Sequence, residues 1–277
     1  MSPVGDGIWR HAVTASKSFS SILLTGGTGT LGQFVETRLR AAGYPVRVLS
    51  RHEHEARSGV EFVTGDLVTG AGLEAAVSGI RTIVHLGGSV KGDDAKTQNL
   101  IRAAVGAGVQ HLVYISVVGA DRVPVVSGID RAMFGYFASK LAAERVVTDS
   151  GLPWTILRAT QFQESLLNLA RGMAKLPVIP VPAFKYQPIA ADEVAARLVE
   201  LVQGTPAGWV PDIAGPRVWD FADLVREYLR VTNRHRVVVR FSLPGQAFAA
   251  IRAGAGLAPD RAVGHRSWEA FLAEQAR

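Results

Sequence analysis

The feature that most constrains this fold is a glycine-rich turn between an apolar run and an amphipathic segment. The residues from Ser21 to Gly32 read S-I-L-L-T-G-G-T-G-T-L-G. The apolar run predicts a buried strand, and the glycines predict a tight turn into a helix. Backbone N–H groups and the positive end of the helix dipole would then face an anion. This arrangement predicts a unit that binds the pyrophosphate of a dinucleotide.

The residues after the turn supply the context that such a glycine pattern needs. Val35, Leu39 and Ala42 recur at helical spacing, and Gly43 ends the segment. A second apolar run follows at 46–49, which completes a strand–helix–strand unit. The alternative is an ordinary strand-to-helix connection that binds no ligand.

Short apolar runs continue to alternate with helical patterns along the first half of the chain, which indicates a parallel sheet with crossover helices. The runs are almost continuously apolar, as expected for a sheet covered on both faces. The predicted class is therefore α/β, a Rossmann-type doubly wound parallel sheet with a smaller C-terminal α/β region that caps the substrate. The expected strands are 21–25, 45–49, 60–64, 80–86, 110–116 and 153–158, and the expected helices are 30–42, 70–78, 93–107, 131–149 and 188–203.

The rhythm changes after Arg158, so we expect three parts in the chain. Residues 1–20 form an N-terminal leader that we expect to be poorly ordered, 21–158 form the dinucleotide-binding core, and 159–277 form a smaller substrate-binding region interleaved with the core sheet. Four prolines between positions 175 and 188 exclude a long helix there. Beyond them we expect helices at 191–202, 220–231 and 267–276 and strands at 209–213 and 237–241, with Asp220 as a helix N-cap.

Composition removes several classes of function. The chain of 277 residues has no cysteine, which excludes disulfides, thiolate nucleophiles and cysteine–zinc sites. No His/Asp/Glu cluster has metal-ligand spacing, and no apolar run approaches the roughly 20 residues that span a membrane. The net charge is +6, yet the basic residues are scattered rather than clustered. We expect a cytoplasmic protein with a small-molecule substrate, and neither nucleic acid nor membrane as a partner.

The end of the second strand indicates which dinucleotide is preferred. An acidic residue at this point would hold the ribose hydroxyls of NAD. This chain has Ser50 and Arg51 instead, and a guanidinium can pair with the 2′-phosphate of NADP. The sequence therefore favours NADP(H) over NAD(H). The alternative is a solvated arginine on a surface turn.

Two further strand ends carry candidate cofactor contacts. Asp66 and Leu67 follow the third strand, where Asp66 could accept from an adenine amine and Leu67 could pack on the ring; Asp66 could equally cap a helix. Gly87, Gly88 and Ser89 follow the fourth strand and would let the backbone approach the ribose and pyrophosphate. His85 lies in the apolar strand before them and is expected to be structural.

A serine, a tyrosine and a lysine are the candidates for chemistry. Ser116 ends the fifth strand, and ligands bind at the carboxyl ends of strands in open α/β sheets. Tyr136 and Lys140 lie four residues apart, on one face of a helix. An ammonium close to the phenol would lower its pKa and make Tyr136 a proton donor to a carbonyl.

With these residues in view, the chain resembles the short-chain dehydrogenase/reductase superfamily, and within it the atypical, NmrA-like branch of NAD(P)-binding proteins. The similarity covers about residues 21 to 275 by the order of motifs. Besides the glycine turn, two runs carry it: N-L-I-R-A-A-V-G-A-G-V-Q-H-L-V-Y-I-S-V-V-G-A-D at 99–121 and W-T-I-L-R-A-T-Q-F at 154–162.

The resemblance implies a role for each candidate residue. The pyrophosphate loop would comprise Thr25, Gly26, Gly27, Thr28, Gly29, Thr30, Leu31 and Gly32. Arg51 would hold the 2′-phosphate, and Lys140 would anchor the nicotinamide ribose. Tyr136 would be the general acid, and Ser116 would polarise the substrate carbonyl. The substrate side of the nicotinamide would be lined by Thr160, Gln161 and Phe162.

Three functions remain open at this point. The first is an NADPH-dependent reductase of a small carbonyl or quinone, with Tyr136 as proton donor; a quinone would depend less on that donor. The second is a non-catalytic sensor of NADP(H), since the branch includes redox sensors that lack the tyrosine. The third is an NAD-dependent epimerase or dehydratase, against which Arg51 argues. The connector at 124–135 is longer than is usual in the branch, and its apolar residues could form a lid.

Overall fold

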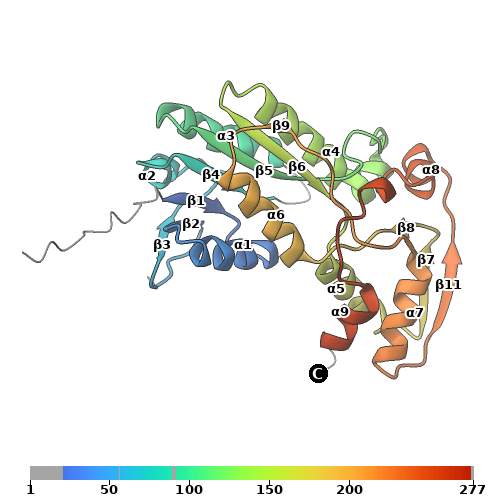
Figure 1. The fold of residues 1–277 in the computed structure, drawn as a ribbon. Coiled ribbons are helices and arrows are strands. Elements are labelled where there is room, and N and C mark those ends of the chain that lie inside the picture. The colour runs from blue at the N-terminus through green and yellow to red at the C-terminus, as the bar shows by residue number, and fades with distance from the viewer. Residues whose placement is uncertain (1–20, 56, 89–91, 276–277) are drawn as a thin grey trace, which may run out of the picture.

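The structure is a computed structural model that describes residues 21–55, 57–88 and 92–275 (Figure 1). The predicted leader at 1–20 and the predicted cofactor residue Ser89 therefore lie outside the described residues. The described chain forms an α/β core, on the left of Figure 1, and a region of short strands and helices on the right.

The core is a sheet of seven parallel strands, which confirms the predicted α/β class. Its order is β3-β2-β1-β4-β5-β6-β9, so the sequence order reverses between β1 and β4. Ligands of open α/β sheets bind at the carboxyl ends of the strands on either side of such a switch point. The strands are β1 (Ile22–Thr25), β2 (Val46–Ser50), β3 (Val60–Thr64), β4 (Thr82–His85), β5 (His111–Val117), β6 (Trp154–Ala159) and β9 (Gly208–Trp209).

Helices cover both faces of this sheet. α1 (Thr30–Ala41) and α6 (Ala191–Gln203) pack on one face, whereas α2 (Leu73–Val77), α3 (Asp93–Gly106) and α4 (Gly128–Thr148) lie on the other (Figure 1). The alternation of side chains along a strand explains the two cores. Ile22 and Leu24 of β1 belong to the cluster under α1 and α6, while Leu23 between them belongs to the cluster under α3 and α4.

The C-terminal region has its own buried core, in which Trp268, Phe271 and Tyr228 pack together. The predicted helices at 191–202, 220–231 and 267–276 and the strand at 237–241 are confirmed, and α5, β7 and α8 are additional elements that the sequence analysis missed. The elements here are α5 (Gln163–Met173), β7 (Val178–Pro182), β8 (Lys185–Tyr186), β10 (Trp219–Asp220), α7 (Phe221–Val231), β11 (Val237–Phe241), α8 (Gln246–Arg252), a 3-10 turn (Pro259–Arg261) and α9 (Trp268–Gln275).

The connector at 124–135 is shorter than expected because α4 begins at Gly128 rather than at 131. Ser127 and Asp130 form a reciprocal capping box: Ser127 Oγ accepts from Asp130 N at 3.0 Å, and Asp130 Oδ2 accepts from Ser127 N at 3.0 Å. Phe134 packs edge-on against Phe248 of α8. The first turns of α4 are thereby joined to the C-terminal region.

Candidate functional site

A cleft of about 480 Å³ lies at the carboxyl ends of β1 to β4, beside the switch point of the sheet. Seven of the predicted cofactor residues line it together, although they come from four separate parts of the chain. They are Gly26, Thr28, Arg51, Asp66, Leu67, Gly87 and Gly88. This convergence places the glycine turn, the end of β2 and the turns after β3 and β4 around a single cavity.

The glycine turn is built so that backbone approaches backbone. Gly26 has a φ of +70°, a left-handed conformation that favours glycine, and a Cβ there would lie 2.9 Å from Gly87 N. A Cβ on Gly32 would lie 2.2 Å from Gly26 O. α1 begins directly after this turn and has no acidic residue in its first turn. Its free N–H groups and its dipole are therefore available to an anion in the cleft.

Thr25 supports this turn from below rather than lining the cleft. Its side chain is buried, and its Oγ1 lies 2.6 Å from His85 Nδ1 and accepts from Gly87 N at 3.1 Å. His85 Nε2 bonds to Thr97 Oγ1 at 3.1 Å, so the ring is held at both nitrogens. Burial, with the nearby Lys140 and Lys96, lowers the pKa of His85 to about 3. The ring is neutral at physiological pH and joins β1, β4 and α3. This agrees with the structural role expected for His85.

The end of the cleft at β2 is lined by basic side chains. Arg51, His52 and His54 line it, Lys96 lines the cleft from α3, and Asp66 is the single carboxylate among the described lining residues. Ser50 Oγ lies 2.9 Å from His54 Nε2 and accepts from His52 N at 3.2 Å, which orders the loop after β2. The potential at this end is suited to a ligand with an additional phosphate.

Asp66 does not cap a helix, which was one of its two predicted roles. Its Oδ1 accepts from Val68 N at 2.9 Å, which closes an Asx turn. α2 begins only at Leu73, after Gly72, so the interpretation of Asp66 as a helix N-cap is wrong. Asp66 and Leu67 both remain on the wall of the cleft, where an adenine contact stays a proposal.

Lys140 is buried in a polar cluster at the end of β5. Its Nζ lies 3.4 Å from Asp93 Oδ2 and donates to Tyr114 Oη and Ile115 O, each at 3.3 Å. A Cβ on Gly88 would lie 2.8 Å from this Nζ, so the ammonium lies directly behind the wall of the cleft. Burial lowers the pKa of Lys140, and the Asp93 carboxylate partly offsets that effect.

The pairing of Tyr136 with Lys140 differs from the prediction. Lys140 Nζ lies 5.8 Å from the centroid of the Tyr136 ring, and its hydrogen bond goes to Tyr114 instead. Burial and the Asp93 carboxylate raise the pKa of Tyr136 to about 12, although the residue remains 38% exposed. The expected lowering of this pKa toward neutrality is therefore wrong. Tyr136 is a neutral phenol at physiological pH and keeps its proton.

Ser116 and Gln161 carry polar atoms that the described protein leaves without partners. Ser116 Oγ is buried near the end of β5, and Gln161 Oε1 is buried just after the end of β6; neither has a hydrogen-bond partner among the described residues. Buried polar atoms without partners are costly, and each invites a ligand or a water. Gln161 Nε2 donates to Gly256 O at 3.4 Å, which links this site to the C-terminal region.

The side chains of Thr160 and Phe162 make contacts within the protein. The Thr160 side chain is buried, and its Oγ1 donates to Gln187 O at 2.6 Å. Phe162 packs against the core under α1 and α6. Of the three predicted substrate residues, Gln161 alone therefore has a polar side-chain atom without a partner.

Several members of this site were not predicted from the sequence. Asp93 and Tyr114 hold Lys140, and His54 and Lys96 line the cleft. Tyr114 could have been found, because it lies two residues before Ser116 on the same face of a strand. Asp93 could not, because the packing of α3 against α4 brings it to Lys140 across 47 positions.

Comparison with known proteins assigns the chain to a family. The sequence pattern described as NAD(P)H-binding matches residues 26–204, which is more than half of the chain. The chain belongs to this NAD(P)H-binding family. The predicted membership of the NAD(P)-binding proteins is thereby confirmed, and a nicotinamide dinucleotide is the cofactor class of the family.

Three relatives illustrate the range of this NAD(P)H-binding family. A (4-alkanoyl-5-oxo-2,5-dihydrofuran-3-yl)methyl phosphate reductase of Streptomyces griseus is 30% identical over 220 residues, 77% of this chain and 74% of that protein. Quinone oxidoreductase 2 of Escherichia coli is 27% identical over 86% of this chain and 83% of its own. Its structure with NADPH has a TM-score of 0.77 at 20% identity and covers 92% of this chain and 100% of that one. The photosystem II assembly factor Ycf39 of Cyanophora paradoxa is 24% identical over 79% of this chain and 71% of its own.

Proposed function

We propose that this protein is an NADPH-dependent reductase of a small quinone-type or carbonyl substrate. The observation that carries the proposal is the lining of the cleft. A glycine turn lies at one end of it, and three basic side chains from the end of β2 lie at the other. Two relatives are named as reductases, and one of them is a quinone oxidoreductase.

The preference for NADPH rests on the residues at the end of β2. Arg51 can pair with a 2′-phosphate through two parallel hydrogen bonds, and His52 and His54 add donors beside it. Asp66, the carboxylate that lines the described cleft, follows β3 and not β2, so it does not take the place of the acidic ribose contact of NAD enzymes. The same arrangement argues against an NAD-dependent epimerase or dehydratase.

NADPH, when bound, supplies a hydride from its nicotinamide ring. The chain would hold it through the glycine turn at the pyrophosphate and Arg51 at the 2′-phosphate, with Lys140 close to the ribose. Gly88 is the residue that allows the Lys140 ammonium to lie directly against the cleft wall. Ser116 Oγ and Gln161 are the polar groups that would orient a substrate oxygen.

The state of Tyr136 favours a quinone over a ketone. A quinone that accepts hydride becomes a stable hydroquinone anion, which takes its proton from water without a dedicated acid. A ketone that accepts hydride becomes a strongly basic alkoxide and needs a proton donor at once. Tyr136 holds a proton, but Lys140 points to Tyr114 and does not activate it. We therefore assign quinones as the better substrates and Tyr136 as an accessory hydrogen-bond donor.

The experiment is NADPH consumption by the purified protein against quinones, ketones and aldehydes, with NADH in parallel. We expect turnover with NADPH, fastest on a quinone. Replacement of Tyr136 by Phe should lower quinone turnover less than about tenfold and ketone turnover by about 100-fold or more. An equal loss on both substrates would contradict the accessory role of Tyr136.

The second candidate is a sensor that binds NADP(H) without turnover. It is favoured by the hydrogen bond of Lys140 to Tyr114 Oη rather than to the Tyr136 hydroxyl, and by the resemblance to an assembly factor. It predicts tight NADPH binding with no oxidation across the whole panel of acceptors.

A further inference from the structure

The two-stranded sheet of the C-terminal region has one buried face and one exposed face. β7 and β11 run parallel and in register, with Val178 beside Val237 and Pro180 beside Val239. Because side chains alternate, Ile179 packs inward against α7 while its neighbours point outward. Val237 is 61% exposed, Val178 50% and Val239 47%. The outward face is therefore apolar, and no described element covers it.

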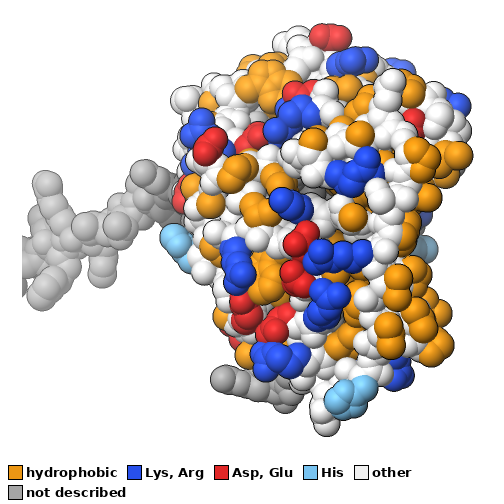
Figure 2. Space-filling view, turned by 90° about the vertical axis from the view of Figure 1, so that its right-hand side faces the viewer, with side chains coloured by type: hydrophobic (Ala, Val, Ile, Leu, Met, Phe, Trp, Pro, Cys, Tyr) orange, Lys and Arg blue, Asp and Glu red, His pale blue; other side chains and the backbone are white. Residues whose placement is uncertain are grey.

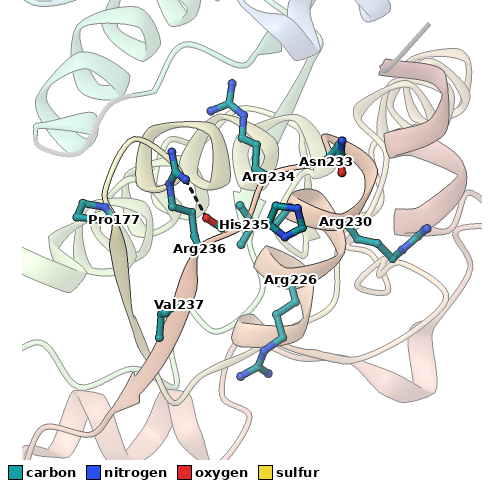
Figure 3. Close-up of a pocket in the computed structure, with 9 residues that line it drawn as sticks. Pro177, Arg226, Arg230, Asn233, Arg234, His235, Arg236 and Val237 are labelled. Carbon is teal, nitrogen blue, oxygen red and sulfur yellow. Dashed lines mark hydrogen bonds between the residues drawn. The ribbon is translucent and has the colours of Figure 1, made fainter.

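A basic pocket adjoins this face at the start of β11. It has a volume of about 600 Å³ and includes Pro177 and Val237 at the ends of the two strands. Its basic lining residues come from the last turns of α7 and from the turn that leads to β11 (Figure 3). They are Arg226, Arg230, Arg234, His235 and Arg236. Figure 2 views the side of the molecule on which β11 lies in Figure 1, and shows hydrophobic side chains gathered at the lower right, with Lys and Arg side chains and some Asp and Glu side chains nearby.

Part of this positive charge is not neutralised by the protein. Arg226 pairs with Asp223 at 2.7 Å and Arg230 with Glu227 at 2.6 Å, both as exposed pairs along α7. Arg236 Nη1 donates to His235 O at 2.8 Å, which leaves its charge uncompensated. No acidic side chain in the described part of the chain pairs with Arg234 or Arg236, and both residues are exposed.

The arrangement of the arginines distinguishes between a small anion and an extended surface. Figure 3 shows Arg234 and Arg236 on one side of the turn, with Arg226 and Arg230 pointing away from them and from each other. A single phosphate ligand needs guanidinium groups that converge on one point. Arg234 and Arg236, which are exposed beside the apolar face and do not converge on one point, are suited to separate phosphates of an extended surface above a layer of hydrocarbon.

We propose that this face, formed by β7, β11 and the basic pocket, is a docking surface for an anionic lipid bilayer. Arg234 and Arg236 would contact the headgroup phosphates, and the exposed valines would lie at the boundary with the acyl chains. No helix of the described residues is long and apolar enough to cross a membrane, so the contact would be with the surface alone. The proposal departs from the expectation of no membrane partner, which rests on the length of apolar runs. It does not depend on the proposed reductase activity.

The experiment is sedimentation of the full chain with vesicles of phosphatidylcholine alone and of phosphatidylcholine mixed with phosphatidylglycerol. We expect binding to the anionic vesicles alone, and weaker binding as salt screens the arginines. Replacement of both Arg234 and Arg236 by Glu should weaken binding by at least about 25-fold. The matched control replaces Arg102 and Arg145, two exposed arginines on α3 and α4, by Glu, and should have little effect.

A second matched pair tests the apolar half of the surface. Val237→Ser should weaken vesicle binding about threefold, whereas Val105→Ser should not, although Val105 of α3 is also exposed, at 52%. NADPH affinity should be unchanged in all four variants, which shows that each is folded. Three results would overturn the proposal: no binding to anionic vesicles, equal losses in the variants and their controls, or binding to soluble polyglutamate in place of vesicles. The last result would assign the surface to an acidic protein.

Discussion

The central sheet is covered on both faces, whereas the small sheet of β7 and β11 is covered on one face and exposed on the other. All seven residues of β5 are buried, because helices cover both faces of the central sheet. The small sheet is covered by α7 on one face only, and its other face is exposed. In the first region the carboxyl edge of the sheet is therefore where polar chemistry can gather. In the second region, one face of the sheet is left exposed by the described residues.

The largest expected effect tests whether the C-terminal region can be destabilised without a change in the cofactor cleft of the central sheet. Phe248 is buried between Phe134 and Phe184, in the cluster that joins α8 to α4. Phe248→Ala should lower the free energy of unfolding by about 3–5 kcal/mol. Because the cleft shares no residue with this cluster, NADPH affinity below the unfolding transition should change less than about twofold. A large loss of affinity in the folded variant would show that the regions are coupled.

The buried histidine of the core sheet should make stability depend on pH. The pKa of His85 is about 3 in the folded protein and 6.5 when unfolded, so between these values the unfolded chain binds more protons. Stability should therefore fall as pH falls from 6.5 toward 3, by an amount on the order of 4 kcal/mol. Urea unfolding of the wild type and of His85→Gln at pH 7 and pH 4 measures this. The same loss of stability in both proteins would contradict it.

A side chain added in the glycine turn should cost more stability than a side chain added at a glycine with open space around it. Gly32→Ala places a Cβ against Gly26 O, and we expect it to cost about 3 kcal/mol of stability and to weaken NADPH binding. Gly106→Ala on α3 is the matched control, since its Cβ would meet nothing within 4 Å. That change should stabilise the helix by up to about 1 kcal/mol. Equal effects of the two substitutions would contradict the role of the close backbone approach at Gly32.

The smallest of these effects concerns the choice of cofactor. Arg51→Ala should weaken NADPH binding about 10- to 100-fold, since it removes a charge-assisted contact with the 2′-phosphate. NADH binding should change less than about threefold, because NADH lacks that phosphate. Direct titration of both cofactors measures the ratio. Equal losses for NADPH and NADH would remove Arg51 from the 2′-phosphate site.

The core could be predicted because its signals are local. Each central strand up to β6 is a short apolar run bounded by polar or glycine residues, and the structure places it within about two residues of the expected range. The cofactor cleft follows from the same signals, because parallel strands bring their carboxyl ends to one edge. Arg51, Asp66 and Gly87 could therefore be assigned to one cavity without any knowledge of packing.

The rest depends on contacts that no local pattern encodes. Lys140 turns to Tyr114 and Asp93 because α3 packs against α4, so spacing along the helix alone gave the wrong partner. β7 contains Pro180 and Pro182, which are tolerated because β11 is its one partner strand among the described residues. Thr160 was expected to face substrate, but its hydroxyl donates a hydrogen bond to the backbone oxygen of Gln187.

A single-turnover experiment on the NADPH complex is the most direct test of reductase activity. NADPH is first bound in excess protein, and its fluorescence is then followed after rapid mixing with a quinone. We expect the protein to bind NADPH more tightly than NADH. We also expect the NADPH fluorescence to be lost on mixing with the quinone. Tight binding with a signal that persists through quinones, ketones and aldehydes would contradict the reductase and establish a sensor.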